Sequence, residues 1–279
     1  MKQLLLLTAI AFYIGANAQI KMPAPSPTQT IKQDFGLGRI ELSYSRPSIK
    51  GRLLFKEESE LAPLGKVWRT GANGSTKIKF TDPVTMGGKA LDSGTYAIFS
   101  IPGKTEWTII INKDSKNAAT QYTESDDIVR FTVPAEKLKE TIENFTMQFA
   151  NFKQESCELH LMWGNTLVII PITIKIKDNI RAQVEKALGA DNVSPNVYSA
   201  AATFYYEWDK DLNKALANIT KATAANQKSP TLFILKAKIE KDLGDKVSAK
   251  SDAQKGVSLA IESKNDDYIR MSKMVLSKM

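Results

Sequence analysis

The hydrophobic pattern of this chain changes its period once, at Asp178. Between residues 30 and 177, short segments alternate apolar and polar side chains, as residues 40–44 (Ile-Glu-Leu-Ser-Tyr) illustrate. From Asp178 onward the apolar side chains recur at helical spacing, first across residues 179–188. Alternation is typical of a strand with one buried face, and the longer spacing is typical of an amphipathic helix. The pattern therefore predicts an all-β domain over residues 30–177, followed by an all-α domain over residues 178–279.

The β domain is expected to be an antiparallel sandwich of about nine or ten strands. Gly87-Gly88 predicts the two-residue turn of a hairpin. Segments 95–101 and 106–112 are apolar on both faces, so we expect them to lie centrally. Later strands are predicted separately over residues 127–133 and 144–152, with room for a turn of helix between them. Nothing in this domain requires a long helix, which argues against a parallel sheet, because parallel strands need crossover connections.

The helical part carries a repeat with a period of 34 residues. Identical residues recur at this distance in three pairs: Asp211 and Asp245, Ala215 and Ala249, and Lys221 and Lys255. The period and its small residues resemble the tetratricopeptide repeat, whose paired helices pack through alanine-sized contacts. The tryptophan and glycine of the full pattern are missing. We therefore predict two degenerate tetratricopeptide-like repeats, with Pro230 opening the second helix pair and a last helix over residues 266–278 capping the stack.

The first 18 residues have the three parts of a secretory signal peptide. Lys2 precedes an apolar run over residues 4–14, and Ala16-Asn17-Ala18 forms a cleavage site of small residues. The run is well short of the ~20 residues that a membrane helix needs, so we expect no membrane span after cleavage. Residues 19–29 hold three prolines in close succession and are expected to form an extended leader. The protein is therefore predicted to be exported.

Charge argues against one class of partner. Lys and Arg outnumber Asp and Glu by 38 to 30, which gives a net charge of +8. The basic and acidic residues are interleaved in both domains, a pattern that favours solubility and attraction of anionic partners. Nucleic-acid binding would be better supported by a dense basic stripe or a recognised module. We predict no nucleic-acid partner.

The chain offers little for catalysis or metal binding. Its single histidine, His160, and its single cysteine, Cys157, have side chains on opposite faces of one predicted strand, so they cannot form a thiol protease dyad. Zinc usually takes three or four protein ligands. Neither a Gly-x-Ser-x-Gly elbow nor a phosphate-binding glycine loop is present. We predict no catalytic residue, no metal and no cofactor. A glycosidase carboxylate pair stays open, because sequence does not give separations in space.

A segment without helical or strand periodicity runs over residues 44–73, and we call it the arginine loop. Its notable side chains are Arg46, Arg52, Trp68, Arg69 and Asn73. In one interpretation the arginines converge on an anionic or polyol ligand and Trp68 stacks on a sugar or an aromatic group. In the other, the arginines bind main-chain carbonyls, Trp68 fills one end of the sandwich and Asn73 caps a turn. We favour the structural interpretation and keep these five residues as ligand-binding candidates.

Several strings of residues, in order, resemble a secreted family of Gram-negative bacteria catalogued as domain of unknown function 2911. They are Tyr44-Ser-Arg-Pro-Ser-x-Lys-Gly-Arg52, Pro63-Leu-Gly-Lys-Val-Trp-Arg-Thr-Gly-Ala-Asn73, Gly94-Thr-Tyr96, Ile101-Pro102, Trp107-Thr and Asn112. The resemblance covers roughly residues 25–177. It implies a periplasmic or extracellular location and is compatible with a helical tail, but it implies no activity. Gly74-Ser75 stands where the family usually has an acidic residue.

These observations favour an exported binding or interaction protein that is not an enzyme. Helical repeats often present a concave face to a peptide, so we expect a protein or peptide partner at the helical domain. The arginine loop is expected to take a glycan or anionic ligand if it binds one. Two alternatives remain: an enzyme acting on polysaccharide or another envelope polymer, with its site at Arg46, Arg52, Trp68 and Arg69, and a carbohydrate-binding module.

Overall fold

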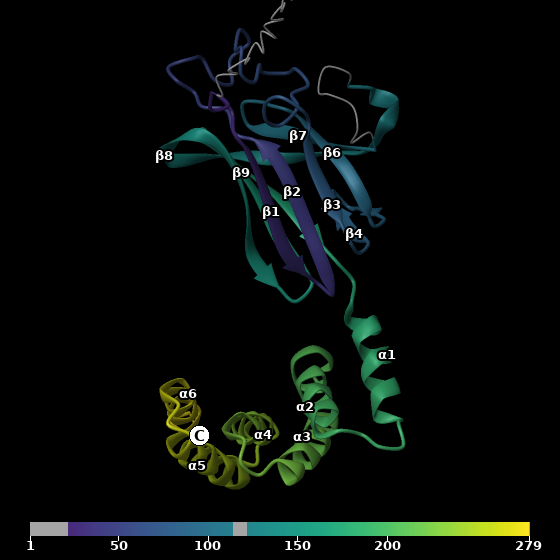
Figure 1. The fold of residues 1–279 in the computed structure, drawn as a ribbon, viewed down its shortest axis with the longest axis vertical. Helices are drawn as coiled ribbons and strands as arrows, with labels where there is room; N and C mark the ends of the chain where they lie inside the picture. Colours follow the sequence, from purple (N-terminus) through teal and green to yellow (C-terminus); the bar gives the residue numbers. More distant parts are fainter. Residues whose placement is uncertain (1–21, 114–121, 279) are drawn as a thin grey trace, which may run out of the picture. The chain divides into compact units, whose positions relative to one another are not determined.

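The structure is a computed structural model that describes residues 22–113 and 122–278 (Figure 1). The chain divides into two compact units, with the division after Ile174. The predicted signal peptide lies outside the described residues, as does the start of the leader. None of the helices in the described ranges is long and apolar enough to cross a membrane.

The first unit is an antiparallel β-sandwich. Its described residues form nine strands, paired in the order β1-β2-β3-β6-β7-β8-β9-β4-β5. Their bounds are β1 (Thr28–Phe35), β2 (Gly38–Ser45), β3 (Thr76–Phe80), β4 (Val84–Met86), β5 (Lys89–Leu91), β6 (Gly94–Ile101), β7 (Glu106–Asn112), β8 (Asp127–Lys153) and β9 (Ser156–Thr173). A short 3₁₀ turn, η1 (Glu124–Asp126), leads into β8. The prediction of an all-β sandwich is confirmed.

Strand β8 joins the two layers of the sandwich. Its first residues pair with β7 as far as Pro134, and from Ala135 onward it pairs with β9. The register shifts on either side of Ile142, and such irregularities bend a strand. Figure 1 shows β8 sweeping across one end of the sheet before it turns back alongside β9. Residues 127–133 and 144–152 are both extended, as predicted, but their division into separate strands is wrong: they belong to one strand, β8, which residues such as Ala135 and Ile142 continue by pairing with β9.

The core follows the alternation seen in the sequence. In β2, Ile40, Leu42 and Tyr44 are buried, whereas the residues between them are partly exposed. Strands β6 and β7 lie in the middle of the strand order, and both have runs of buried residues. Their predicted central position is confirmed. Removal of these apolar side chains from water is the main stabilising contribution to such a sandwich.

The predicted hairpin turn is also confirmed. Gly87 and Gly88 connect β4 to β5, with φ angles of 56° and 76°. Both angles lie in the left-handed region that favours glycine. A Cβ atom at Gly87 would lie 2.1 Å from the ring of Phe131, so this position also lacks space for a side chain.

The second unit is all α-helical, as predicted. Its elements are α1 (Lys177–Leu188), α2 (Pro195–Phe204), the π-helical turn η2 (Tyr205–Asp209), α3 (Leu212–Ala225), α4 (Pro230–Asp242), α5 (Lys246–Glu262) and α6 (Asp266–Leu276). Helices α2 and α3 form one packed pair and α4 and α5 form the next, while α6 packs against both helices of the second pair. Gly189 follows the last residue of α1, where a helix stop was expected.

Residues that recur with the period of 34 have the same structural role in each pair. The carboxylate of Asp211 accepts a hydrogen bond from the backbone N–H of Lys214, and that of Asp245 accepts one from Ser248, both at 3.0 Å. Each aspartate is therefore the N-cap of the second helix of its pair. The repeat of 34 residues in the sequence therefore corresponds to a repeated pair of helices in the structure.

The two helix pairs also share a contact between a lysine and an aromatic ring. The ammonium of Lys221 lies 5.1 Å from the ring centroid of Tyr198, and that of Lys255 lies 5.2 Å from that of Phe233. In each pair a lysine of the second helix thus covers an aromatic ring of the first. The recurring alanines, Ala215 and Ala249, are both fully buried. The assignment of these pairs to the tetratricopeptide family stays a prediction.

Candidate functional site

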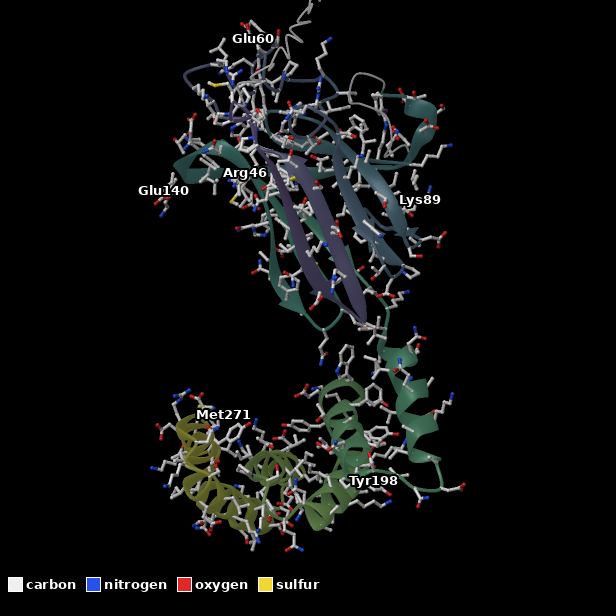
Figure 2. All side chains as sticks on the ribbon, viewed as in Figure 1. Arg46, Glu60, Lys89, Glu140, Tyr198 and Met271 are labelled. Atoms are coloured by element: carbon white, nitrogen blue, oxygen red, sulfur yellow. The ribbon has the colours of Figure 1, made fainter. Side chains whose placement is uncertain are left out.

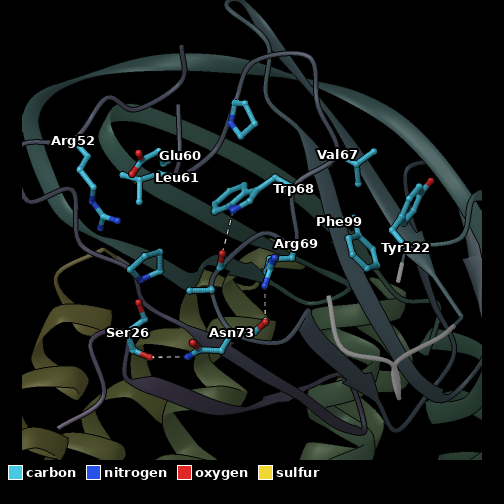
Figure 3. A pocket seen from close by; sticks show the side chains of 14 residues that line it. Ser26, Arg52, Glu60, Leu61, Val67, Trp68, Arg69, Asn73, Phe99 and Tyr122 are labelled. Atoms are coloured by element: carbon cyan, nitrogen blue, oxygen red, sulfur yellow. Dashed lines mark hydrogen bonds between the residues drawn. The ribbon is translucent and has the colours of Figure 1, made fainter. Parts of the chain in front are cut away.

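A pocket of about 510 Å³ lies where the arginine loop covers one end of the sandwich (Figure 3). Four of the five predicted ligand-binding candidates line it: Arg52, Trp68, Arg69 and Asn73. Glu60, Phe99 and Tyr122 also line it, and Figure 3 shows Glu60 near Arg52 and Phe99 beside Tyr122. The structure therefore brings together most of the residues that the sequence singled out.

Arg46 is the candidate that does not line the pocket. Its Nε donates to the backbone oxygen of Phe145 at 3.1 Å, and its Nη2 donates to the Thr146 hydroxyl at 2.8 Å. Both partners belong to β8. In Figure 2, Arg46 lies where the strands give way to loops, with Glu60 further out. Arg46 ties the start of the arginine loop to the sheet.

Arg52 and Arg69 use only part of their hydrogen-bonding capacity. Arg52 donates from Nε to the carbonyl of Ile49 at 3.1 Å and from Nη2 to that of Ser48 at 2.6 Å. Arg69 donates from Nη1 to the carbonyl of Asn73 at 2.7 Å. A guanidinium carries five N–H donors. Among the described residues, each of these two arginines therefore retains donors that can face a ligand.

Trp68 is buried in a cluster of aromatic rings, with 5% of its surface exposed. It stacks on Trp163 with ring centroids 5.6 Å apart, and it meets Trp107 and Phe145 edge to face. Its indole N–H donates to the carbonyl of Gly71 at 3.0 Å (Figure 3). The ring therefore supports the pocket from below, and little of it is available to stack on a sugar.

Asn73 connects the arginine loop to the leader. Its side-chain amide donates to the carbonyl of Ser26 at 3.1 Å and to the Ser45 hydroxyl at 3.2 Å. Its own carbonyl accepts the hydrogen bond from Arg69. Its φ angle of 61° is left-handed, a conformation that asparagine tolerates better than most residues. Asn73 thus shapes the pocket rim while most of its polar groups are already bonded.

The backbone beneath Arg69 is strained. Thr70 has a φ angle of 52°, which is an outlier for a β-branched residue. Two buried hydrogen bonds hold it: its hydroxyl bonds to that of Ser100 at 2.9 Å, and its carbonyl accepts from the Thr76 hydroxyl at 2.5 Å. Strain of this kind costs on the order of 1–3 kcal/mol and tends to cluster at functional sites.

The opposite wall of the pocket consists of Phe99 and Tyr122, whose ring centroids are 5.0 Å apart. The Tyr122 hydroxyl donates to Asp127 at 2.6 Å, and the same carboxylate accepts from Arg130 at 2.6 Å and from Asn112 at 2.9 Å. Burial, followed by the bond to Asp127, raises the pKa of Tyr122 to about 12. The ring is therefore fixed and its hydroxyl stays neutral at physiological pH.

Sequence reasoning missed Phe99 and Tyr122 as part of this site. Phe99 belongs to β6 and Tyr122 precedes η1, so both lie far from the arginine loop in sequence. Only the pairing of strands brings them beside Arg69. Of Glu60, Phe99 and Tyr122, only Glu60 lies within the arginine loop, so only Glu60 could be linked to the site from its position in the sequence.

His160 and Cys157 lie in β9, outside the lining of the pocket. The His160 ring is 2.7 Å from the carboxylate of Glu158, which also accepts from Asn151 at 2.6 Å. These two bonds lower the pKa of Glu158. Burial, with the nearby charge of Glu158, raises the pKa of Cys157 to about 12, so this side chain stays a thiol.

Within residues 22–113 and 122–278, no group of three metal-binding side chains occurs.

Comparison with known families identifies the sandwich. A family model described as "Protein of unknown function (DUF2911)" matches residues 26–172, more than half of the chain. The chain belongs to this family. The DUF2911 match begins at Ser26, whose carbonyl binds Asn73, and it ends within β9, so it contains every described residue that lines the pocket.

The family confirms the resemblance found in the sequence, but its description carries no activity. No curated protein matches the chain. The features of this DUF2911 protein that bear on its function are the pocket and the surfaces of the two units.

Proposed function

We propose that this protein is an exported binding protein whose sandwich pocket holds a small anionic ligand. The observation that carries the proposal is the presence of Arg52 and Arg69 on one pocket, each with N–H donors to spare. Guanidinium groups bind carboxylates and phosphates through paired hydrogen bonds. Among the described lining residues, these two cations face one carboxylate, that of Glu60, which leaves the pocket positive.

Further support comes from the way the pocket is built. The strained Thr70 holds Arg69 on the rim, and the bonded Tyr122 holds the opposite wall. A pocket with fixed walls loses little conformational freedom when a ligand binds. The strain at Thr70 is easier to understand if the position of Arg69 matters for function.

An anion is favoured over a neutral sugar because of Trp68. Sugar-binding sites usually offer an exposed aromatic face, whereas the Trp68 ring is covered by other aromatic side chains and its N–H is already bonded. An enzyme acting on polysaccharide is supported by Glu60 at the pocket, but glycoside hydrolysis needs a second carboxyl group. Asp127 does not supply it, since its oxygens are bonded to Tyr122, Arg130 and Asn112.

We also propose that the helical unit binds a protein partner. Its two helix pairs repeat capping, packing and surface contacts with one period. Stacked helix pairs of this kind present extended surfaces to peptides. The pocket and the helical unit are tested separately.

Isothermal titration calorimetry tests the pocket. The chain from residue 19 onward is titrated with inorganic phosphate, citrate and galacturonate, and with neutral glucose. We expect at least one anion to bind and glucose not to bind, with Arg52→Gln and Arg69→Gln each weakening affinity by about tenfold, since each removes a charge-assisted contact. Arg39→Gln, an exposed arginine of β2 outside the pocket, is the matched control.

Two results would reject the pocket as an anion site. One is the absence of binding by every anion of the panel. The other is equal affinity in the Arg52, Arg69 and Arg39 variants, which would indicate non-specific attraction to the net positive charge. Release of reducing sugar ends from bacterial polysaccharide by the wild-type chain would favour the enzyme instead.

A further inference from the structure

The helical unit contains a depression of about 310 Å³, separate from the sandwich pocket. Its lining comes from three elements of that unit and from Lys278, which follows α6. Tyr206 belongs to η2, Lys238 and Lys241 belong to α4, and Met274 belongs to α6. Because α4 is the first helix of its pair and η2 extends the first helix of the preceding pair, the depression lies along one side of the repeat.

Part of the depression is apolar. Met274 is 54% exposed and supplies the apolar part of the lining together with Val275. Next to it, Val275 is buried and packs in a cluster with Ile234 and Ala237. An exposed methionine over an apolar base is a surface that gains from covering by another apolar side chain.

The remainder of the depression is cationic. Lys238, Lys241 and Lys278 line it, and none of them forms an ion pair within the described residues. The acidic lining residue, Asp242, accepts a hydrogen bond from the Tyr206 hydroxyl at 2.7 Å.

Lys236 also belongs to α4 but, unlike the lysines of the depression, it forms ion pairs. It pairs with Asp252 at 2.6 Å and with Glu240 at 3.3 Å, so its charge is compensated within the unit. The three lysines of the depression outnumber the carboxylate of Asp242, so its described lining is net positive. Complementary charge would have to come from another molecule.

We propose that this depression binds an acidic segment of a partner protein, with an apolar side chain against Met274 and carboxylates beside Lys238, Lys241 and Lys278. The inference rests on the helical part of the proposed function and is independent of the sandwich pocket. A recessed site with cations around an apolar base suits a single side chain flanked by acids. A membrane surface would instead call for a protruding apolar face.

Phage display with the intact mature chain tests the proposal. A random heptapeptide library is selected against wild-type protein, and the enriched peptides are synthesised with a fluorescent label. We expect peptides with net negative charge and at least one large apolar residue. Their affinity should fall at least tenfold in the variant Lys238→Glu/Lys241→Glu/Lys278→Glu, and should weaken as salt is raised.

A matched variant controls for total charge. Lys228→Glu/Lys246→Glu/Lys250→Glu changes the net charge by the same amount at exposed positions outside the depression, and it should bind the peptides as wild type does. Circular dichroism checks that both variants keep their helices. Failure of this test leaves the anion pocket untouched, because these lysines do not line that pocket and its calorimetry depends on the Arg52 and Arg69 variants.

The proposal is overturned if the enriched peptides are neutral or basic, if no peptide is enriched, or if the two triple variants lose binding equally. Co-sedimentation with vesicles of anionic phosphatidylglycerol tests whether the depression binds a membrane surface instead. Vesicle binding that is lost in the first triple variant, without any peptide enrichment, would assign the lysines to a membrane surface and would also contradict a peptide site.

Discussion

The three arginines of the arginine loop carry the same charge but use their N–H donors differently. Arg46 binds two groups of β8, whereas Arg69 binds a single carbonyl of its own loop. The first residue therefore contributes to the free energy of folding, and the second is available to a ligand. This division of roles is the basis of the proposed function at the residue scale.

Replacement of Arg46 by Met is expected to lower the free energy of unfolding by about 1–3 kcal/mol, since it removes charge-assisted hydrogen bonds and leaves the Phe145 carbonyl without its donor. Arg69→Gln is expected to change it by less than about 0.5 kcal/mol. Urea unfolding followed by tryptophan fluorescence measures both. Equal stability of the two variants would show that Arg46 is not a structural tie.

Glu240 makes the stability of the helical unit depend on pH. It is buried beside Asp252 and Lys236, and burial, followed by the charge of Asp252, raises its pKa to about 7. The unfolded chain loses this proton near the ordinary value of about 4.5. Stability should therefore fall as the pH rises from about 4.5 through about 7, and it should level off about one pH unit above the folded pKa.

Glu240→Gln should remove this dependence. At pH 8 we expect the variant to be more stable than wild type by on the order of 2 kcal/mol, and at pH 5 we expect the two to be similar. Thermal melts followed by the helical circular dichroism signal provide the measurement. A variant that is less stable than wild type at pH 8 would indicate that Lys236 stabilises the ionised Glu240 by more than burial destabilises it, which would contradict the raised pKa.

At the scale of elements, alternation in the sequence was sufficient to predict most of the sheet. Strands such as β2 have one buried face, and the period that decides this is local. Strand β8 was divided wrongly because the residues after Pro134 are polar and lack alternation, so nothing local marks them as extended. Their conformation depends on hydrogen bonds to β9, which follows in the chain and could not be aligned from sequence.

The turn between β4 and β5 offers a test at this scale. Gly87→Ala should destabilise the protein by about 2–3 kcal/mol, because it adds left-handed strain and places a Cβ against the Phe131 ring. Gly88→Ala is the control: it has a similar φ but open space, so about 1 kcal/mol is expected. Equal midpoints of urea unfolding for the two variants would argue against the contact with Phe131.

The whole molecule combines two units that each leave cationic side chains around a hollow. In the sandwich these are Arg52 and Arg69, and in the helical unit they are lysines of α4 and of the residues after α6. Sequence predicted the two fold classes and the arginine candidates, because period and composition are local properties. It could not predict which arginine faces the pocket, since the partners of Arg46 lie about 100 residues further along the chain.

Export is a property of the whole chain and can be measured directly. Expressed from its first residue in a Gram-negative host, the protein is expected in the periplasm or medium with Gln19 as its first residue. Mass spectrometry of the purified chain determines this end. Ala18→Lys should block cleavage, and recovery of the uncleaved wild-type chain in the cytoplasm would contradict the predicted signal peptide.

The central claim, that Arg52 and Arg69 bind an anion while Arg46 holds the fold, is tested most directly by nuclear magnetic resonance of the arginine Nε–Hε groups. Citrate and, separately, inorganic phosphate are added to labelled protein whose three signals have been assigned with single variants. The account predicts that the signals of Arg52 and Arg69 shift with saturation and that the signal of Arg46 stays in place. Movement of Arg46 alone, or of none of the three, would contradict it.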